Sequence, residues 1–237
     1  MKRRNPGRMP DTPVETPQAW TVPFTRRSSR PLPRAIAVVA VVLATVGATG
    51  CMVEDTTPPP SGGMSSAPAQ LRELTVAPAK STRGYSRSRF PHWRSVGKNC
   101  DVRDTVLQRD GTDIKLSGCN VVGGRWISRY DNRTLASPTE VDIDHMVPLA
   151  NAWRSGADEW DDDKRAEFAN DLDRPQLHAV SATSNRAKGD QDPSQWKPPN
   201  RQDWCQYARD WIAVKYYWRL SVTDAEKAAL GDMLGSC

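Results

Sequence analysis

The stretch that decides the fold reads Val141-Asp142-Ile143-Asp144-His145-Met146-Val147-Pro148. Its β-rich start predicts a short strand, and Pro148 is expected to stop that strand because proline cannot donate a ladder hydrogen bond. An acid and a histidine therefore stand side by side near a strand end. Since side chains alternate along a strand, Asp142 and Asp144 are expected on one face and Ile143 on the other.

A second stretch has a matching organisation. Leu177 to Val180 predicts another short strand, and a polar helical turn follows it. Ser181 is the expected N-cap of this helix and Gly189 its expected end. Asn185 and Lys188 are three residues apart, so they are expected to share one face of the helix. The order is thus strand, loop, strand, helix.

This order, with Asp-His on the first strand and Asn-x-x-Lys on the helix, resembles the HNH (ββα-metal) nucleases. More closely, the chain is similar to actinobacterial secreted HNH endonuclease family proteins related to the C-terminal domain of GmrSD-type restriction enzymes. The resemblance covers roughly Phe90 to Cys237. The phrases that carry it are Asp142–Leu149, Phe168–Asp171, Ala179–Ser181, Asn185–Asp190 and Trp196–Pro199.

The resemblance implies that His145 is a general base and that Asp144 and Asn185 bind a divalent metal. These residue types suit hydrolysis of a phosphodiester. A neutral imidazole accepts a proton near neutral pH, and a hard cation prefers oxygen ligands while Mg²⁺ keeps several waters. Mg²⁺ is the expected metal, with Mn²⁺ or Zn²⁺ as alternatives. Arg186 and Lys188 are candidates for phosphate contact.

Three other residues are candidates for supporting roles. The middle Asn of the HNH motif is absent, and Pro175-Gln176-Leu177 stands in its place. Gln176 is therefore a candidate for orienting His145, through its side chain or its backbone. Asp142 is either a supporting acid or a solvated charge. Arg103 sits in a phrase that recurs in the resembling family, and is either a phosphate contact or part of a surface ion pair.

The N-terminal part of the chain is predicted to direct export. Residues 1–50 combine a positive start, a short apolar run and a small-residue exit, as in a secretory signal. Ala48-Thr49-Gly50-Cys51 resembles a lipobox, whose cysteine would carry lipid; a non-lipidated secreted protein and an uncleaved anchor are the alternatives. Residues 51–88 are rich in Pro, Ser, Thr and Gly, which predicts a disordered tether. The domain proper is expected at 89–237.

Cysteine usage agrees with export. The chain has five cysteines, and lipidation of Cys51 would leave an even number. In an exported protein this predicts two disulfides. Three pairings can form, and Cys100–Cys119 with Cys205–Cys237 is favoured because each bridge then stays within its own module. Zinc binding is the alternative, but no pair has the close spacing of a zinc knuckle.

The net charge of +5 belongs mainly to the predicted signal. The basic isoelectric point is therefore no argument for nucleic-acid binding. The distribution is more suggestive, because residues 51–139 hold 13 basic and 8 acidic groups whereas residues 140–237 hold 12 and 18. A basic half that receives phosphates beside an acidic half that holds a metal would fit a nuclease, although an accidental asymmetry across one fold fits as well.

The remaining pattern predicts strands and helices around the two stretches. Ile114–Leu116 and Asn120–Val122 alternate like strands, and Trp126–Tyr130 predicts another. Apolar residues recur at three and four from 203 to 220, which predicts an amphipathic helix. Thr223 begins a capping box for a last helix. We expect an α+β fold in which a small antiparallel sheet and helices surround a ββα-metal core.

These observations lead to one expected function and two alternatives. We expect a monomeric, metal-dependent endonuclease, exported as a membrane lipoprotein or secreted, that cuts DNA or also RNA. Little sequence preference is expected because no separate recognition module is visible. The first alternative is a non-catalytic tethered lipoprotein that binds nucleic acid or a wall polymer, favoured only by Gln176. The second is a metal-dependent hydrolase of another phosphoester.

Overall fold

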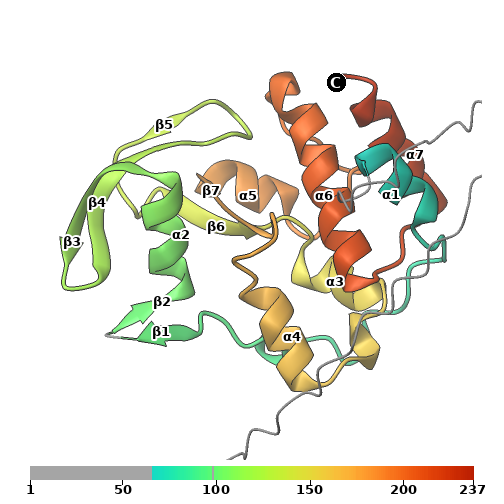
Figure 1. Cartoon of the computed structure of the whole chain (residues 1–237), viewed down its shortest axis with the longest axis horizontal. Helices are drawn as coiled ribbons and strands as arrows, with labels where there is room; N and C mark the ends of the chain where they lie inside the picture. Colours follow the sequence, from blue (N-terminus) through green and yellow to red (C-terminus); the bar gives the residue numbers. More distant parts are fainter. Residues whose placement is uncertain (1–65, 98) are drawn as a thin grey trace, which may run out of the picture. The chain divides into compact units, whose positions relative to one another are not determined.

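The computed structural model describes residues 66–97 and 99–237. The predicted signal, the lipobox with Cys51 and residues 51–65 of the predicted tether lie outside the described residues. Within them the fold is α+β, as predicted, with seven α-helices and small antiparallel sheets (Figure 1). None of these helices is long and apolar enough to cross a membrane.

The described strands form three separate sheets instead of one, and every pairing in them is antiparallel. The sheets comprise β1 (Ser95–Gly97) with β2 (Cys100–Asp101), β3 (Thr112–Ser117) with β4 (Asn120–Ile127) and β5 (Thr134–Leu135), and β6 (Val141–His145) with β7 (Leu177–Ser181). The described helices are α1 (Ala67–Glu73), α2 (Val102–Asp110), α3 (Leu149–Arg154), α4 (Asp162–Ala169), α5 (Ala182–Lys188), α6 (Trp204–Trp218) and α7 (Asp224–Leu234).

The β6–β7 pair with α5 is the strand, strand and helix unit that the sequence predicts. In its register Asp144 lies opposite His178. Ile143 and Ala179 are buried in a cluster with α2 and β4. Because side chains alternate across a strand, the two aspartates of β6 lie on the opposite face, where α5 contacts them. The alternation of side chains along β6 thus places Asp142 and Asp144 on the face that α5 contacts.

The ends of α5 are those predicted. The side chain of Ser181 accepts a hydrogen bond from the backbone N–H of Ser184, which satisfies one free donor of the first turn. The helix stops at Gly189, whose φ of 56° lies in the left-handed region that glycine adopts without a steric penalty. Two caps therefore fix the length of the helix that carries Asn185 and Lys188.

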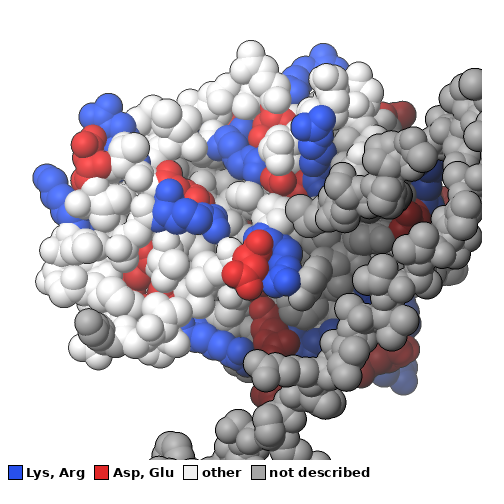
Figure 2. All heavy atoms as spheres, viewed as in Figure 1, with Lys and Arg blue, Asp and Glu red and all other residues white. Residues whose placement is uncertain are grey.

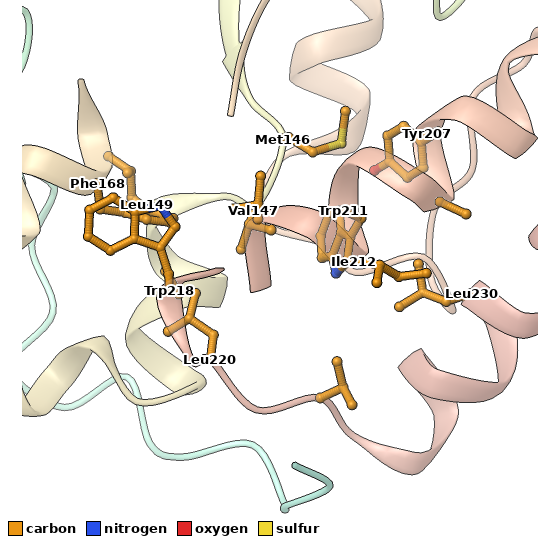
Figure 3. Close-up of a cluster of buried hydrophobic side chains, with 14 of the residues drawn as sticks. Met146, Val147, Leu149, Phe168, Tyr207, Trp211, Ile212, Trp218, Leu220 and Leu230 are labelled. Atoms are coloured by element: carbon orange, nitrogen blue, oxygen red, sulfur yellow. The ribbon is translucent and has the colours of Figure 1, made fainter. Parts of the chain in front are cut away.

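The main apolar core joins the helices to the loop that follows β6. Met146 and Val147 leave β6 and enter this core, where they meet the aromatic face of α6 (Figure 3). Trp211 and Tyr207 of α6 are fully buried there, together with Phe168 of α4. The period of three and four predicts this face correctly. The core therefore holds the backbone next to His145 in place from the side of α6.

The folded domain begins earlier than the sequence analysis places it. Helix α1 lies beside α6 and α7 (Figure 1), with Leu71 and Leu74 buried in the main core. A backbone hydrogen bond from Ala77 to Val222 continues this contact. The predicted tether is therefore wrong for residues 66–88. The Pro- and Ser-rich composition of this segment conceals Leu71 and Leu74, which are buried because α1 packs on other helices.

Both predicted disulfides are confirmed. Cys100–Cys119 joins β2 to the turn between β3 and β4, and Cys205–Cys237 joins the first turn of α6 to the end of the chain. The surface carries mixed charge. On the face shown in Figure 2, Lys and Arg side chains are interleaved with Asp and Glu. The two oppositely charged halves of the sequence do not produce a surface of one sign on this face.

Candidate active site

A cavity of about 200 Å³ opens where β6 ends. Asp144 and His145 of β6 line it, together with Asn185 of α5. The start of α3 closes another side, and Tyr85 and Arg87 from the segment before β1 complete the wall. Three of the residues that the sequence singles out are thus brought to one cavity.

His145 is buried and has one fixed tautomer. Its Nε2 lies 2.9 Å from the carbonyl oxygen of Ala169. Because a carbonyl can only accept, Nε2 carries the proton and Nδ1 keeps its lone pair. Nδ1 has no hydrogen-bond partner among the described residues. The ring is stacked with that of Trp93, with 5.3 Å between the ring centroids and 3° between the planes. The ring of His92 lies nearly perpendicular to it, with 5.4 Å between the centroids.

Burial, with smaller contributions from the positive charges of Arg87 and Lys188, lowers the pKa of His145 to about 3. The carbonyl of Ala169 opposes this shift by stabilising the protonated nitrogen. The imidazole is therefore neutral throughout the neutral pH range. A neutral ring with a free Nδ1 can accept a proton without first losing one.

Asp144 lies in a buried ion pair. Its Oδ2 accepts hydrogen bonds from the hydroxyl of Tyr130 at 2.6 Å and from Nζ of Lys188 at 2.6 Å. Nζ of Lys188 also donates to the carbonyls of His145 and Met146. Burial lowers the pKa of Lys188, whereas the charge of Asp144 raises it. Lys188 thus neutralises the carboxylate and fixes the backbone that directly follows the side chain of His145.

This geometry contradicts the prediction that Lys188 contacts a phosphate. The side chain is 0% exposed, and its three donors go to three oxygens of the protein. The shared face with Asn185 is confirmed, but Lys188 points under β6 whereas Asn185 lines the cavity. Sequence spacing gives the face of a helix and not the depth that a long side chain reaches.

Asn185 and Asp142 lie together at the rim. Nδ2 of Asn185 donates to Oδ2 of Asp142 at 3.2 Å, which leaves Oδ1 of Asn185 as the free end of the amide. Asp142 therefore orients Asn185, as expected of a supporting acid. Arg186 is 77% exposed, and its Nε lies 3.8 Å from Asp142. Its role as a phosphate contact stays a prediction.

Gln176 and Arg103 support the backbone and do not touch His145. The side chain of Gln176 pairs with the N–H and the carbonyl of Val147, and its own carbonyl accepts the N–H of Met146. Gln176 therefore supports the loop after β6, and its side chain does not orient the imidazole. Nη2 of Arg103 donates to the carbonyls of Pro138 and Val141, which links α2 to the start of β6. Its role as a phosphate contact stays a prediction.

The donor atoms fit a hard divalent cation. Oδ1 of Asp144 and Oδ1 of Asn185 accept no hydrogen bond from the described residues, and both side chains line the cavity. One carboxylate and one amide oxygen suffice for Mg²⁺, which keeps several waters. Among the described residues no group of three or more His, Cys, Asp or Glu side chains is placed to hold a metal. A closed zinc-type cage is therefore not the arrangement found in this part of the chain.

Two features of the site escape sequence reasoning. The group that orients His145 is a backbone carbonyl, so no side chain at Ala169 could signal it. The wall that stacks on the imidazole comes from His92 and Trp93, and Tyr85 and Arg87 precede the expected domain boundary. The run of arginines before Phe90 is the one signal that could have pointed to this wall.

The strand pair that carries Asp144 and His145 and the helix that carries Asn185 lie in one α+β domain. Residues 103–233 match the family described as GmrSD restriction endonucleases, C-terminal domain, and the chain belongs to that family. A protein of Arthroderma benhamiae described as an uncharacterized secreted protein is 50% identical over 182 residues, which cover 76% of this chain and 89% of that protein. No solved structure matches the chain.

Proposed function

We propose that this protein is an exported, metal-dependent endonuclease of the HNH type that hydrolyses phosphodiester bonds of DNA with little sequence preference. The observation that carries the proposal is the state of His145. A neutral imidazole, fixed by Ala169 and with a free Nδ1, lies in one cavity with Asp144 and Asn185. The family match and the secreted relative support the nuclease class and the exported location.

The proposed role of each residue follows from its contacts. Nδ1 of His145 accepts a proton from the attacking water, and the carbonyl of Ala169 stabilises the imidazolium that forms. Asp144 and Asn185 would hold the cation, and Asp142 keeps the amide of Asn185 in position. A cation held there would supply positive charge next to the phosphate and its leaving oxygen. Trp93 keeps the imidazole from turning.

The binding-only alternative has lost its one supporting feature. That feature was Gln176, which replaces the Asn expected to orient the base. The contact of Nε2 of His145 with the carbonyl of Ala169 supports an orienting role for that carbonyl, so in this proposal a glutamine at 176 is no argument against catalysis. Lipid attachment at Cys51 stays a separate proposal, because no described residue bears on it.

The test uses the exported chain with both disulfides formed, mixed with supercoiled plasmid and Mg²⁺. We expect nicking that stops with a chelator and returns with Mg²⁺ or Mn²⁺. His145→Ala is expected to lower the rate at least 100-fold, since general bases contribute 10²–10⁴-fold. Gel densitometry over time gives the rates.

The matched control is His178→Gln on β7. His178 is also buried, and its pKa is also lowered to about 3, mainly by burial. Its nitrogens are already engaged, with Nε2 on the carbonyl of Pro175 and Nδ1 facing Arg129. This variant should keep most of the activity at a temperature where it is folded. An intact plasmid for the native chain with each metal would reject the proposal.

A further inference from the structure

A strap of residues 77–94 crosses the domain outside the part that matches the family. Its first half is held by a backbone bond from Lys80 to Arg154, and its end by a bond from the N–H of Arg94 to the side chain of Asn170. Between them Phe90 is fully buried. The strap is therefore a fixed part of the domain, although the family match begins only at residue 103.

The strap contributes both to the surroundings of His145 and to the cavity wall. The ring of Trp93 is stacked with the imidazole of His145, and the ring of His92 lies nearly perpendicular to that imidazole. Tyr85 and Arg87 line the opening next to Asp144 and Asn185. A segment outside the family match thus encloses the catalytic candidate.

Arg87 is the one cationic side chain among the described residues that line the cavity. It is exposed, and its guanidinium makes no hydrogen bond or ion pair with any described residue. Two cations nearby are occupied, whereas the exposed Arg186 stays a separate candidate. Lys188 is buried on Asp144, and Arg154 pairs with Asp190 at 2.5 Å. The phosphate contact that the sequence assigns to Lys188 must therefore come from another residue.

We propose that Arg87 binds a phosphate group of the nucleic-acid backbone at this cavity, so that the strap completes the active site. The proposal rests on the proposed function and names the residue that recognises its substrate. A guanidinium presents a planar fork of donors that matches two phosphate oxygens, and it stays charged at any working pH. Charges of both signs are interleaved on the face shown in Figure 2, so that face presents no broad positive field.

The experiment compares the full chain with Arg87→Ala, Arg87→Lys and Arg125→Ala. Arg125 is an exposed arginine on β4 that does not line the cavity, and it serves as the matched control. Two readouts are used: plasmid nicking with Mg²⁺, and binding of a short fluorescent DNA duplex in the His145→Ala background. Thermal unfolding confirms that each variant is folded, which we expect because the side chain of Arg87 has no hydrogen-bond or ion-pair partner among the described residues.

We expect Arg87→Ala to weaken duplex binding and nicking by about tenfold to a hundredfold, as for the loss of a hydrogen bond to a charged group. The slope of log affinity against log salt should fall by about 0.9, the value for one phosphate contact on B-DNA. Arg87→Lys should restore part of the loss, because the charge returns without the fork. Arg125→Ala should match the parent chain.

The outcomes separate this proposal from the proposed function. If the native chain does not nick DNA but Arg87→Ala still weakens binding and lowers the salt slope, the phosphate site stands and the nuclease fails. If the native chain nicks DNA and Arg87→Ala leaves rate, affinity and slope unchanged, the nuclease stands and the phosphate site is overturned. If the native chain shows no nicking and no binding that depends on Arg87, both proposals are overturned.

Discussion

The buried pair of Lys188 and Asp144 shows how a single residue can be misread from spacing. Asn185 and Lys188 share a helix face, so the sequence alone predicts that both face the same bound substrate. In the structure the lysine extends beneath the strand to Asp144 and two backbone carbonyls. Nothing local in the sequence gives that depth, since it depends on where β6 lies against α5. Asp144 could be singled out because the Asp-His phrase, which is weak alone, combines with the Asn-x-x-Lys phrase at the expected spacing.

The pair makes a first prediction about stability. Lys188→Met removes the cation and leaves a buried carboxylate, so the free energy of unfolding should fall by about 3–5 kcal/mol. Adding Asp144→Asn removes the unpaired charge, and the double variant should be more stable than Lys188→Met alone. Urea titration at pH 7 measures all three chains. Equal losses in the single and double variants would show that the two side chains are not coupled.

At the scale of elements, composition conceals what packing builds. Helix α1 has seven residues, and a helix that short is marginal in water by itself. It exists because Leu71 and Leu74 pack on α6 and α7. The end of β4 also differs from the prediction. The strand predicted for 126–130 ends at Ile127, because a turn with a left-handed Asn132 reverses the chain into β5.

The strap and α1 lead to a second prediction, about the boundary of the domain. A chain that starts at Arg89 loses two buried leucines, worth roughly 2 kcal/mol each, together with the contacts of Tyr85. A typical domain has a stability of about 5–15 kcal/mol. The chain from Arg89 should therefore unfold at much lower urea than the chain from Ser66, and it should also lack Arg87 in the cavity.

Leu71→Ala with Leu74→Ala in the chain from Ser66 is the control for this truncation. It removes the apolar contacts of α1 but keeps the strap. The double variant should lose stability and retain nicking at low temperature, whereas the truncated chain should lose both. If the chain from Arg89 has the same urea midpoint and the same nicking rate as the longer chain, residues 66–88 are not needed for stability or activity. The domain boundary predicted from composition, at residue 89, would then be correct.

For the whole molecule, two disulfides are typical of proteins of an oxidising compartment. The pairing could be predicted because each bridge closes a local module. The enclosure of the cavity could not, because it joins β6, α5, α3 and the strap, which are far apart in the sequence. Local patterns predict elements and caps, while a site assembled from distant segments depends on packing that one sequence does not display.

The two bridges allow a last prediction at this scale. They close loops with sequence separations of 19 and 32 residues, so loop-closure entropy assigns each about 3–4 kcal/mol. Replacing either pair by serines should lower the free energy of unfolding, measured by urea titration, by a similar amount.

The Cys205–Cys237 variant frees the first turn of α6 beside Tyr207, Trp204 and the main core. The Cys100–Cys119 variant frees only β2 and the β3–β4 turn, which do not line the cavity. Nicking measured at equal folded fraction should therefore be near normal for the Cys100–Cys119 variant. A complete loss of activity in this variant while it is still folded would show that β2 and the hairpin take part in the site, and the strap alone would then not explain how the cavity is completed.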